Sequence, residues 1–154
     1  MLCPFCRIAA GELDAVVVYE DSDVVAFLDI GPIRPGHTQI IPRRHVETFE
    51  QLPPDLATRI LLLAQHLAKR MKVVYDVERV AFLFTGGDVP HAHAHVVPMH
   101  TKTDITSARY VVEPVDLRLS SAHLLADRAT LLQVREDLAF APDSFGARTG
   151  AHAG

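Results

Sequence analysis

The chain has 154 residues, 49% of them hydrophobic and 22% charged, and a formal net charge of −4. This length fits one domain with a sizeable core, and the acidic balance argues against an extended nucleic-acid footprint. No apolar run approaches the ~20 residues that span a bilayer, and the first residues lack the basic and apolar regions of a signal peptide. We therefore expect a cytoplasmic protein without membrane or nucleic-acid partners.

Short apolar runs separated by turn residues fill the first part of the chain. Residues 8–11 are expected to form a helical turn that ends at the glycine. The runs at 16–19 and 24–28 flank a polar turn, which predicts a β-hairpin. A loop rich in proline and glycine over 29–36 leads into a third strand at 37–41.

A long amphipathic helix is predicted next, over residues 53–72. Prolines and an early aspartate in its first turn suit a helix N-terminus. Its apolar residues recur at spacings of three and four, which predicts a stripe facing the core: Leu56, Ile60, Leu63, Leu67 and Met71.

The remaining elements complete an antiparallel α+β domain. A strand at 80–84 and a glycine-containing turn at 85–88 lead into a histidine-rich strand, which predicts a second hairpin. Residues 120–138 are expected to form a helix. We expect one domain over 1–140, followed by a flexible tail at 141–154.

The histidine-rich segment reads Pro-His-Ala-His-Ala-His-Val-Val-Pro. Alternation with period two predicts a strand on which His91, His93 and His95 line one face, with the alanines on the other. A solvated polar face is the plain interpretation. The two functional interpretations are a metal site and nucleophilic catalysis by an imidazole, and the spacing alone leaves both open.

Two cysteines, Cys3 and Cys6, lie three residues apart near the start of the chain. In a cytoplasmic protein this spacing favours metal or redox chemistry over a structural disulfide. A thioredoxin-like redox role is disfavoured, because no strand precedes the pair.

Six motifs occur in order between residues 3 and 99: Cys-Pro-Phe-Cys-Arg-Ile-Ala, Val-Tyr-Glu-Asp, Phe-Leu-Asp-Ile, Pro-Gly-His-Thr, Ile-Pro-Arg-Arg-His and His-Ala-His-Ala-His-Val-Val-Pro. This series resembles the histidine triad (HIT) family of nucleotide hydrolases and transferases. The resemblance implies a HIT fold, with a five-stranded antiparallel sheet and one long helix. It also implies a homodimer in which two such sheets join into one of ten strands.

The resemblance also implies roles for the histidines. His93 would attack the α-phosphorus of a nucleotide and form a covalent nucleotidyl-histidine, which water would hydrolyse. Neutral imidazole is a good nucleophile, and its ordinary pKa near 6.5 keeps it mostly neutral at cytoplasmic pH. His95 would donate a hydrogen bond to a phosphoryl oxygen. His37 would lie near the triad, where orientation, proton relay and plain packing are the alternatives.

A nucleotide pocket follows from the same resemblance. Asp29 would accept hydrogen bonds from the ribose hydroxyls, and its alternative role is that of a turn-forming residue. Four apolar residues would enclose a purine, with ordinary core packing as the alternative: Phe5, Ile8, Phe27 and Ile30.

One branch of the family holds a zinc ion at positions that correspond here to Cys3, Cys6, His45 and His91. Four such ligands make a closed tetrahedral site, so the zinc would be structural. The alternative is a pair of reduced, metal-free cysteines. No organic cofactor is expected.

The loop before the triad departs from the family pattern. Many members carry an asparagine-containing loop followed by Gly-Gln-Ser/Thr-Val, whereas this chain has Gly86, Gly87 and Asp88. Asp88 would repel a phosphate unless it is protonated, paired or turned away. The two glycines could compensate by offering backbone N–H groups to a phosphate.

The sequence therefore predicts a nucleotide hydrolase that cleaves the α-phosphate bond of AMP conjugates such as nucleoside phosphoramidates. A dinucleoside polyphosphate hydrolase or a phosphorylase would use the same intermediate. A nucleotide-binding module with decayed catalysis and a structural zinc is the rival from another class.

Overall fold

The computed structural model describes residues 3–86, 88–105, 111–113, 118–119 and 125–140. The expected tail at 141–154 lies outside them, as does Gly87. The elements in chain order are α1 (Pro4–Ala9), β1 (Val17–Glu20), β2 (Val24–Leu28), β3 (Thr38–Pro42), the 3-10 turn η1 (Phe49–Gln51), α2 (Pro54–Tyr75), β4 (Arg79–Thr85), β5 (His93–Met99), β6 (Val111–Glu113), β7 (Arg118–Leu119) and α3 (Arg128–Leu138).

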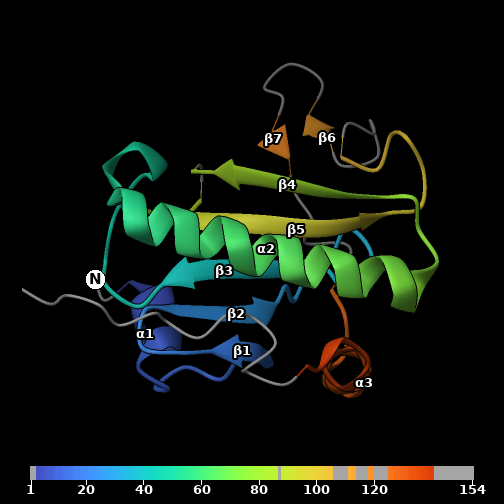
Figure 1. The fold of residues 1–154 in the computed structure, drawn as a ribbon, viewed down its shortest axis with the longest axis horizontal. Helices are drawn as coiled ribbons and strands as arrows, with labels where there is room; N and C mark the ends of the chain where they lie inside the picture. The colour runs from blue at the N-terminus through green and yellow to red at the C-terminus, as the bar shows by residue number, and fades with distance from the viewer. Residues whose placement is uncertain (1–2, 87, 106–110, 114–117, 120–124, 141–154) are drawn as a thin grey trace, which may run out of the picture.

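Five antiparallel strands form the main sheet in the order β1-β2-β3-β5-β4, and β6 and β7 form a separate pair. The long helix α2 runs across one face of the sheet in front of β3 and β5 (Figure 1). The predicted five-stranded sheet with one long helix is confirmed. Within the described residues, no helix is long and apolar enough to cross a membrane.

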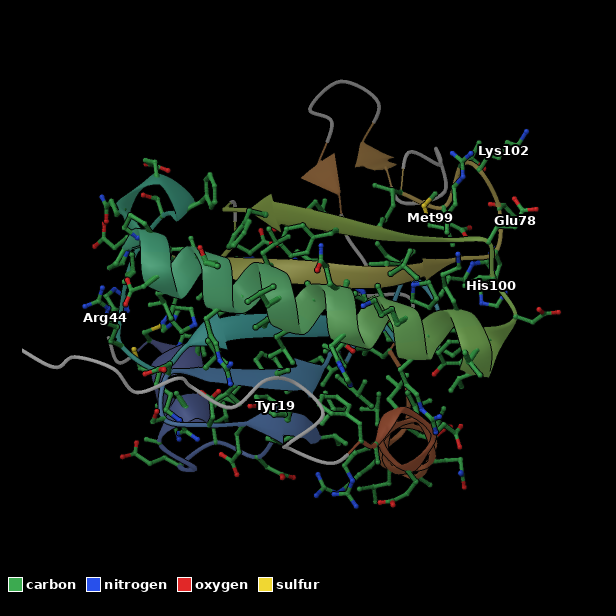
Figure 2. The ribbon with its side chains drawn as sticks, viewed as in Figure 1. Tyr19, Arg44, Glu78, Met99, His100 and Lys102 are labelled. Carbon is green, nitrogen blue, oxygen red and sulfur yellow. The ribbon has the colours of Figure 1, made fainter. Side chains whose placement is uncertain are left out.

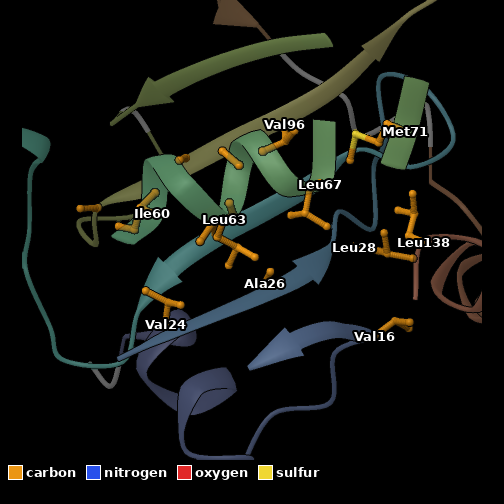
Figure 3. Close-up of a cluster of buried hydrophobic side chains, with 14 of the residues drawn as sticks. Val16, Val24, Ala26, Leu28, Ile60, Leu63, Leu67, Met71, Val96 and Leu138 are labelled. Atoms are coloured by element: carbon orange, nitrogen blue, oxygen red, sulfur yellow. The ribbon is translucent and has the colours of Figure 1, made fainter. Parts of the chain in front are cut away.

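Alternation along β2 creates two apolar layers, one on each face of the sheet. Val24, Ala26 and Leu28 belong to the larger core, which also contains the stripe of α2 (Figure 3). Val25 and Phe27 point to the other face and join a smaller cluster with α1. The predicted stripe of α2 is buried, and burial of each large side chain contributes roughly 1.5–3 kcal/mol.

The strand that carries the histidines begins two residues later than the alternation of the sequence predicts. β5 starts at His93, so the placement of His91 on the strand is wrong. The His91 ring instead lies within hydrogen-bond distance of the Pro42 carbonyl, and the Ala92 amide donates to the Val46 carbonyl. These two hydrogen bonds hold His91 and Ala92 against the end of β3 and the connection that follows it. The segment therefore joins the sheet only from His93 onward.

Helix boundaries also differ from the expectations. α1 begins at Pro4, a residue that suits the first turn of a helix, and the expected turn at 8–11 is only its end. α2 continues to Tyr75 and stops where Asp76 adopts a left-handed conformation with φ of 49°. The helix expected from residue 120 begins at Arg128 within the described residues, because the Asp127 side chain caps its first turn.

Candidate functional site

Helix α1 and its N-cap residue bring two thiols to the segment just before β5. The Nδ1 atom of His91 lies 3.5 Å from the sulfur of Cys3 and 3.5 Å from that of Cys6. His45, on the connection after β3, places its own Nδ1 atom 3.3 Å from the Cys6 sulfur. All four potential ligand atoms lie within 4.8 Å of one another. The structure therefore brings together all four residues of the predicted zinc site.

The donor set fits a tetrahedral zinc ion. The Nε2–H of His91 donates to the Pro42 carbonyl at 2.9 Å, so Nδ1 presents its lone pair to the two sulfurs. In a tetrahedral site, sulfur and nitrogen ligands stand about 3.6 Å apart, close to the separations found here. Burial, followed by the neighbouring Cys3 thiol, raises the pKa of Cys6 in the metal-free site. A bound dication would favour the thiolate instead.

His93 is held in one tautomer by the backbone. Its Nδ1–H donates to the His91 carbonyl at 2.6 Å, so its Nε2 atom carries the lone pair. That atom faces the hydroxyl of Thr85, the last residue of β4, at 3.2 Å. The ring is buried and meets the Phe5 ring edge-on, with centroids 5.2 Å apart. A neutral imidazole with its free nitrogen fixed in direction can act as a nucleophile.

A chain of hydrogen bonds fixes the tautomers of two further histidines. The Ile33 amide donates to Nδ1 of His37 at 3.2 Å, so the proton of that ring lies on Nε2. This Nε2–H donates to Nδ1 of His95 at 2.8 Å. The Nε2–H of His95 then donates to the Thr85 hydroxyl at 2.8 Å. The structure therefore brings His37, which was expected only near the triad, into direct contact with His95.

Burial keeps these histidines neutral. It is the largest cause that lowers the pKa of His37, and the nearby Asp29 carboxylate opposes the effect. Burial, then the neighbouring imidazoles of His37 and His93, lower the pKa of His95 to about 4. Burial likewise lowers the pKa of His91. At neutral pH, His37 and His95 therefore act as neutral hydrogen-bond donors and not as cations.

Asp29 is held from both sides at the end of β2. One carboxylate oxygen accepts from the Gly31 amide at 2.8 Å, and the other accepts from the Gln39 side chain at 2.6 Å. The second oxygen also lies 3.7 Å from Nε2 of His37. Because Gln39 donates to Asp29, its amide oxygen faces the other way, and that buried oxygen has no partner among the described residues. Both side chains offer unused acceptors to a ligand that carries hydroxyl groups.

Asp29, His37 and His95 form a second group with ligand atoms within 4.8 Å, but its tautomers do not suit a metal. A metal on Nε2 of His37 would require the proton to move to Nδ1, where it would oppose the Ile33 amide. In the zinc cluster, by contrast, the free lone pair of His91 already faces the sulfurs. Within the described residues, the chemistry of the donors therefore favours the cysteine–histidine cluster.

The predicted apolar pocket is only partly assembled. The rings of Phe5 and Phe27 meet edge-on with centroids 5.6 Å apart, and Ile8 packs against their cluster. Ile30 lies outside this cluster and is 66% exposed. Gly86 and Asp88 are exposed beside the triad, and a Cβ atom at Gly86 would meet nothing within 4 Å.

Thr85 and Gln39 are site residues that the motifs did not reveal. Thr85 was expected only as part of a turn, and Gln39 only as part of a strand. The signal was the antiparallel register, which places Thr85 opposite His93 and Gln39 opposite His95. His100 lies at the other end of the molecule from Arg44, the neighbour of His45 (Figure 2). Its ring meets that of Tyr75.

Comparison with known proteins identifies the family. The HIT domain profile matches residues 10–102. The chain belongs to the HIT family. An uncharacterised HIT-like protein from Methanocaldococcus jannaschii is 35% identical over 103 residues, which cover 64% of this chain and 80% of that protein. The yeast adenosine 5'-monophosphoramidase HNT1 of Saccharomyces cerevisiae is 34% identical over 97 residues, which cover 62% of this chain and 61% of that protein.

A solved relative of this HIT protein contains zinc. The zinc-bound histidine triad protein from Mycobacterium smegmatis superposes with a TM-score of 0.61 at 27% identity, covering 87% of this chain and 96% of that one. The family profile begins after both cysteines, so the match to residues 10–102 does not depend on the cysteine pair.

Proposed function

We propose that this HIT protein is a hydrolase that cleaves AMP conjugates such as nucleoside phosphoramidates through a covalent intermediate on His93. The observation that carries the proposal is the 2.6 Å hydrogen bond from Nδ1 of His93 to the His91 carbonyl. It fixes the lone pair on Nε2, which opens toward the exposed end of β4 at Thr85.

The reaction has two displacements at phosphorus. Nε2 of His93 forms a bond to the α-phosphorus while the bond from phosphorus to the amine nitrogen breaks, and the amine takes a proton from solvent as it leaves. Water then attacks the same phosphorus, releases AMP and frees His93, and the proton from that water returns to solvent. The Nε2–H of His95, on the same side of β5 as His93, donates to a phosphoryl oxygen and stabilises the charge that develops there.

Binding of the nucleoside uses the groups behind the triad. The Asp29 carboxylate and the unpartnered oxygen of Gln39 accept hydrogen bonds from the ribose hydroxyls. Phe5 and Phe27 provide the apolar wall for the purine, and the exposed Ile30 is the fourth apolar residue proposed for it. The exposed backbone at Gly86 allows the loop to approach the phosphate, and the exposed Asp88 is free to turn its charge toward solvent.

The choice of leaving group rests on the relative from yeast, whose name specifies a monophosphoramidase. A dinucleoside polyphosphate hydrolase or a phosphorylase would share the intermediate. A catalytically decayed binding module is the rival, and we disfavour it because His93 keeps both a fixed tautomer and a free Nε2 lone pair, as a nucleophile requires.

We expect adenosine 5'-phosphoramidate to be hydrolysed to AMP at kcat/KM at least about tenfold above that of diadenosine polyphosphates. Release of AMP measured by chromatography across a panel of both classes, with guanosine counterparts, gives the comparison. Hydrolysis of the diadenosine polyphosphates alone would contradict the phosphoramidase and indicate a dinucleoside polyphosphate hydrolase. Binding of AMP without turnover of any compound would favour the decayed module.

We further propose a homodimer that joins two sheets along β4. This strand is the last in the sheet order, and its sequence contains no proline and only one charge, at Arg79. Phe82 is 39% exposed, and Phe49 is 53% exposed with its ring 4.6 Å from that of Phe84. An exposed apolar edge strand is prone to pairing with another chain unless it is covered.

Replacing Phe82 with lysine is expected to convert the dimer to a monomer, because a charge at the centre of the interface would be buried without a partner. Light scattering after size-exclusion chromatography measures the mass. Leu125→Lys is the matched control, because Leu125 is 68% exposed but precedes α3. A wild-type monomer at micromolar concentration, or a Phe82→Lys dimer, would count against the proposal.

A structural zinc ion held by Cys3, Cys6, His45 and His91 completes the proposal. It would tie α1, which carries Phe5, to the segment whose His91 carbonyl fixes His93. A closed site with four protein ligands supplies stability and not a reactive water. Cysteines that bind a metal ion and form no disulfide are typical of a reducing compartment, and we propose a cytoplasmic location.

A further inference from the structure

We propose that Thr85 is a catalytic residue whose hydroxyl caps the nucleophile in the free protein and turns to the phosphoryl group when substrate binds. The inference rests on the proposed function and adds to it a donor that the motifs do not contain. It is carried by the position of one hydroxyl oxygen, 3.2 Å from Nε2 of His93 and 2.8 Å from Nε2 of His95.

The directions of the hydrogen bonds follow from the fixed tautomers. His95 carries its proton on Nε2, because its Nδ1 accepts from His37. The Thr85 oxygen therefore accepts from His95, and its own single proton is left to donate to Nε2 of His93. The hydroxyl thus occupies the lone pair that must attack phosphorus. A substrate can reach His93 only if this hydroxyl turns away.

The location of Thr85 permits that movement. It is the last residue of β4, where pairing with His93 on β5 holds its backbone in place. The residue is exposed, so a ligand from solvent can reach its side chain. Only rotation about the Cα–Cβ bond is needed, and a β-branched side chain moves between few discrete rotamers. When the hydroxyl turns, the Nε2–H of His95 also loses its acceptor and becomes available to the same phosphoryl oxygens.

The composition of the following loop explains why the hydroxyl is needed. Gly86 and Gly87 have no side-chain donor, and an ionised Asp88 is only an acceptor. The side chains at positions 86–88 therefore provide no hydrogen-bond donor to a phosphate. Thr85 supplies a hydroxyl from the strand end instead. A donor aimed at charge that develops in the transition state is typically worth about 10²–10³-fold in rate.

The test compares Thr85→Val, which keeps the shape and removes the hydroxyl, with Thr85→Ser, which keeps the hydroxyl. Calorimetric titration with AMP and with adenosine separates the phosphate contact from the nucleoside contacts. We expect Thr85→Val to bind AMP about tenfold more weakly and adenosine within about twofold of wild type, because a hydrogen bond to a charged group is lost. For the phosphoramidate, kcat/KM should fall about 10²-fold, mostly in kcat, while Thr85→Ser stays within about fivefold.

Two results would overturn the role of Thr85. One is a Thr85→Val protein with wild-type AMP binding and turnover. The other is an equal loss of AMP and adenosine binding, which indicates a purely structural role. A wild-type protein that binds AMP but hydrolyses nothing would overturn the proposed hydrolase, and the difference between AMP and adenosine would still decide whether Thr85 contacts the phosphate.

Discussion

Replacement of His93 by alanine is expected to lower phosphoramidate hydrolysis by ~10³-fold or more. The variant removes the only atom proposed to bond with phosphorus. His95 cannot take its place, because it faces the site with a protonated nitrogen and its remaining lone pair is occupied by His37. Initial rates of AMP release under saturating substrate give the comparison.

The control is His100→Ala, which removes an imidazole at the far end of β5 beside Tyr75 and should leave the rate within about twofold of wild type. AMP affinity of His93→Ala should stay close to that of wild type, since the ribose and purine contacts remain. A variant that retains a tenth or more of the wild-type rate would refute nucleophilic catalysis by His93.

Loss of zinc is expected to have the second large effect, on stability. The purified protein should contain one zinc ion per chain, and Cys6→Ser should lose it. We expect the melting temperature to fall by about 10 °C or more, because the proposed zinc ion would link α1 to the segment before β5 and each kcal/mol is worth roughly 2–4 °C in a chain of this size. Elemental analysis and calorimetry measure the two quantities.

The wild-type protein treated with chelator and then resupplied with zinc is the matched control, and its melting temperature should return. His100→Ala, which lies away from the cluster, should keep both its zinc and its melting temperature. Zinc well below one ion per chain, together with freely titrating thiols at Cys3 and Cys6, would show that the cluster is a pair of reduced cysteines beside two histidines.

The sequence was sufficient to predict an element where the periodicity of that segment alone determines its secondary structure. The spacing of Leu56, Ile60, Leu63 and Met71 predicted α2 because all four pack on one face of one sheet. The run that became β2 is apolar at every position because each face of the sheet has its own apolar layer. The resemblance to the HIT family then implied a five-stranded antiparallel sheet with one long helix, whereas the order of the strands came only from the structure.

Long-range contacts explain where local patterns failed. Alternation alone placed His91 on the strand, but its bond to the Pro42 carbonyl, 49 residues away in sequence, holds it before the strand begins. The helix expected from residue 120 ignored the cap at Asp127, which fixes the start of α3. Each error is at a boundary, where one hydrogen bond outweighs a weak periodic signal.

Thr85 shows why the site could not be completed from motifs. Threonine before a glycine pair is an ordinary turn sequence, and the motifs singled out the glycines and Asp88 after it but not the threonine itself. Its importance arises from the register of β4 against β5, which sets its hydroxyl between two imidazoles. Gln39 is similar, because only the pairing of β3 with β5 places it beside Asp29 and opposite His95.

The most direct measurement is a search for the covalent intermediate. Wild-type protein mixed with adenosine 5'-phosphoramidate and quenched rapidly at high pH, where phosphorylated imidazole survives, is digested and its peptides are weighed. We predict a peptide heavier by one adenylyl group, with the modification on His93 and absent from His93→Ala. Steady turnover with no such adduct, or an adduct on another residue, would contradict the account.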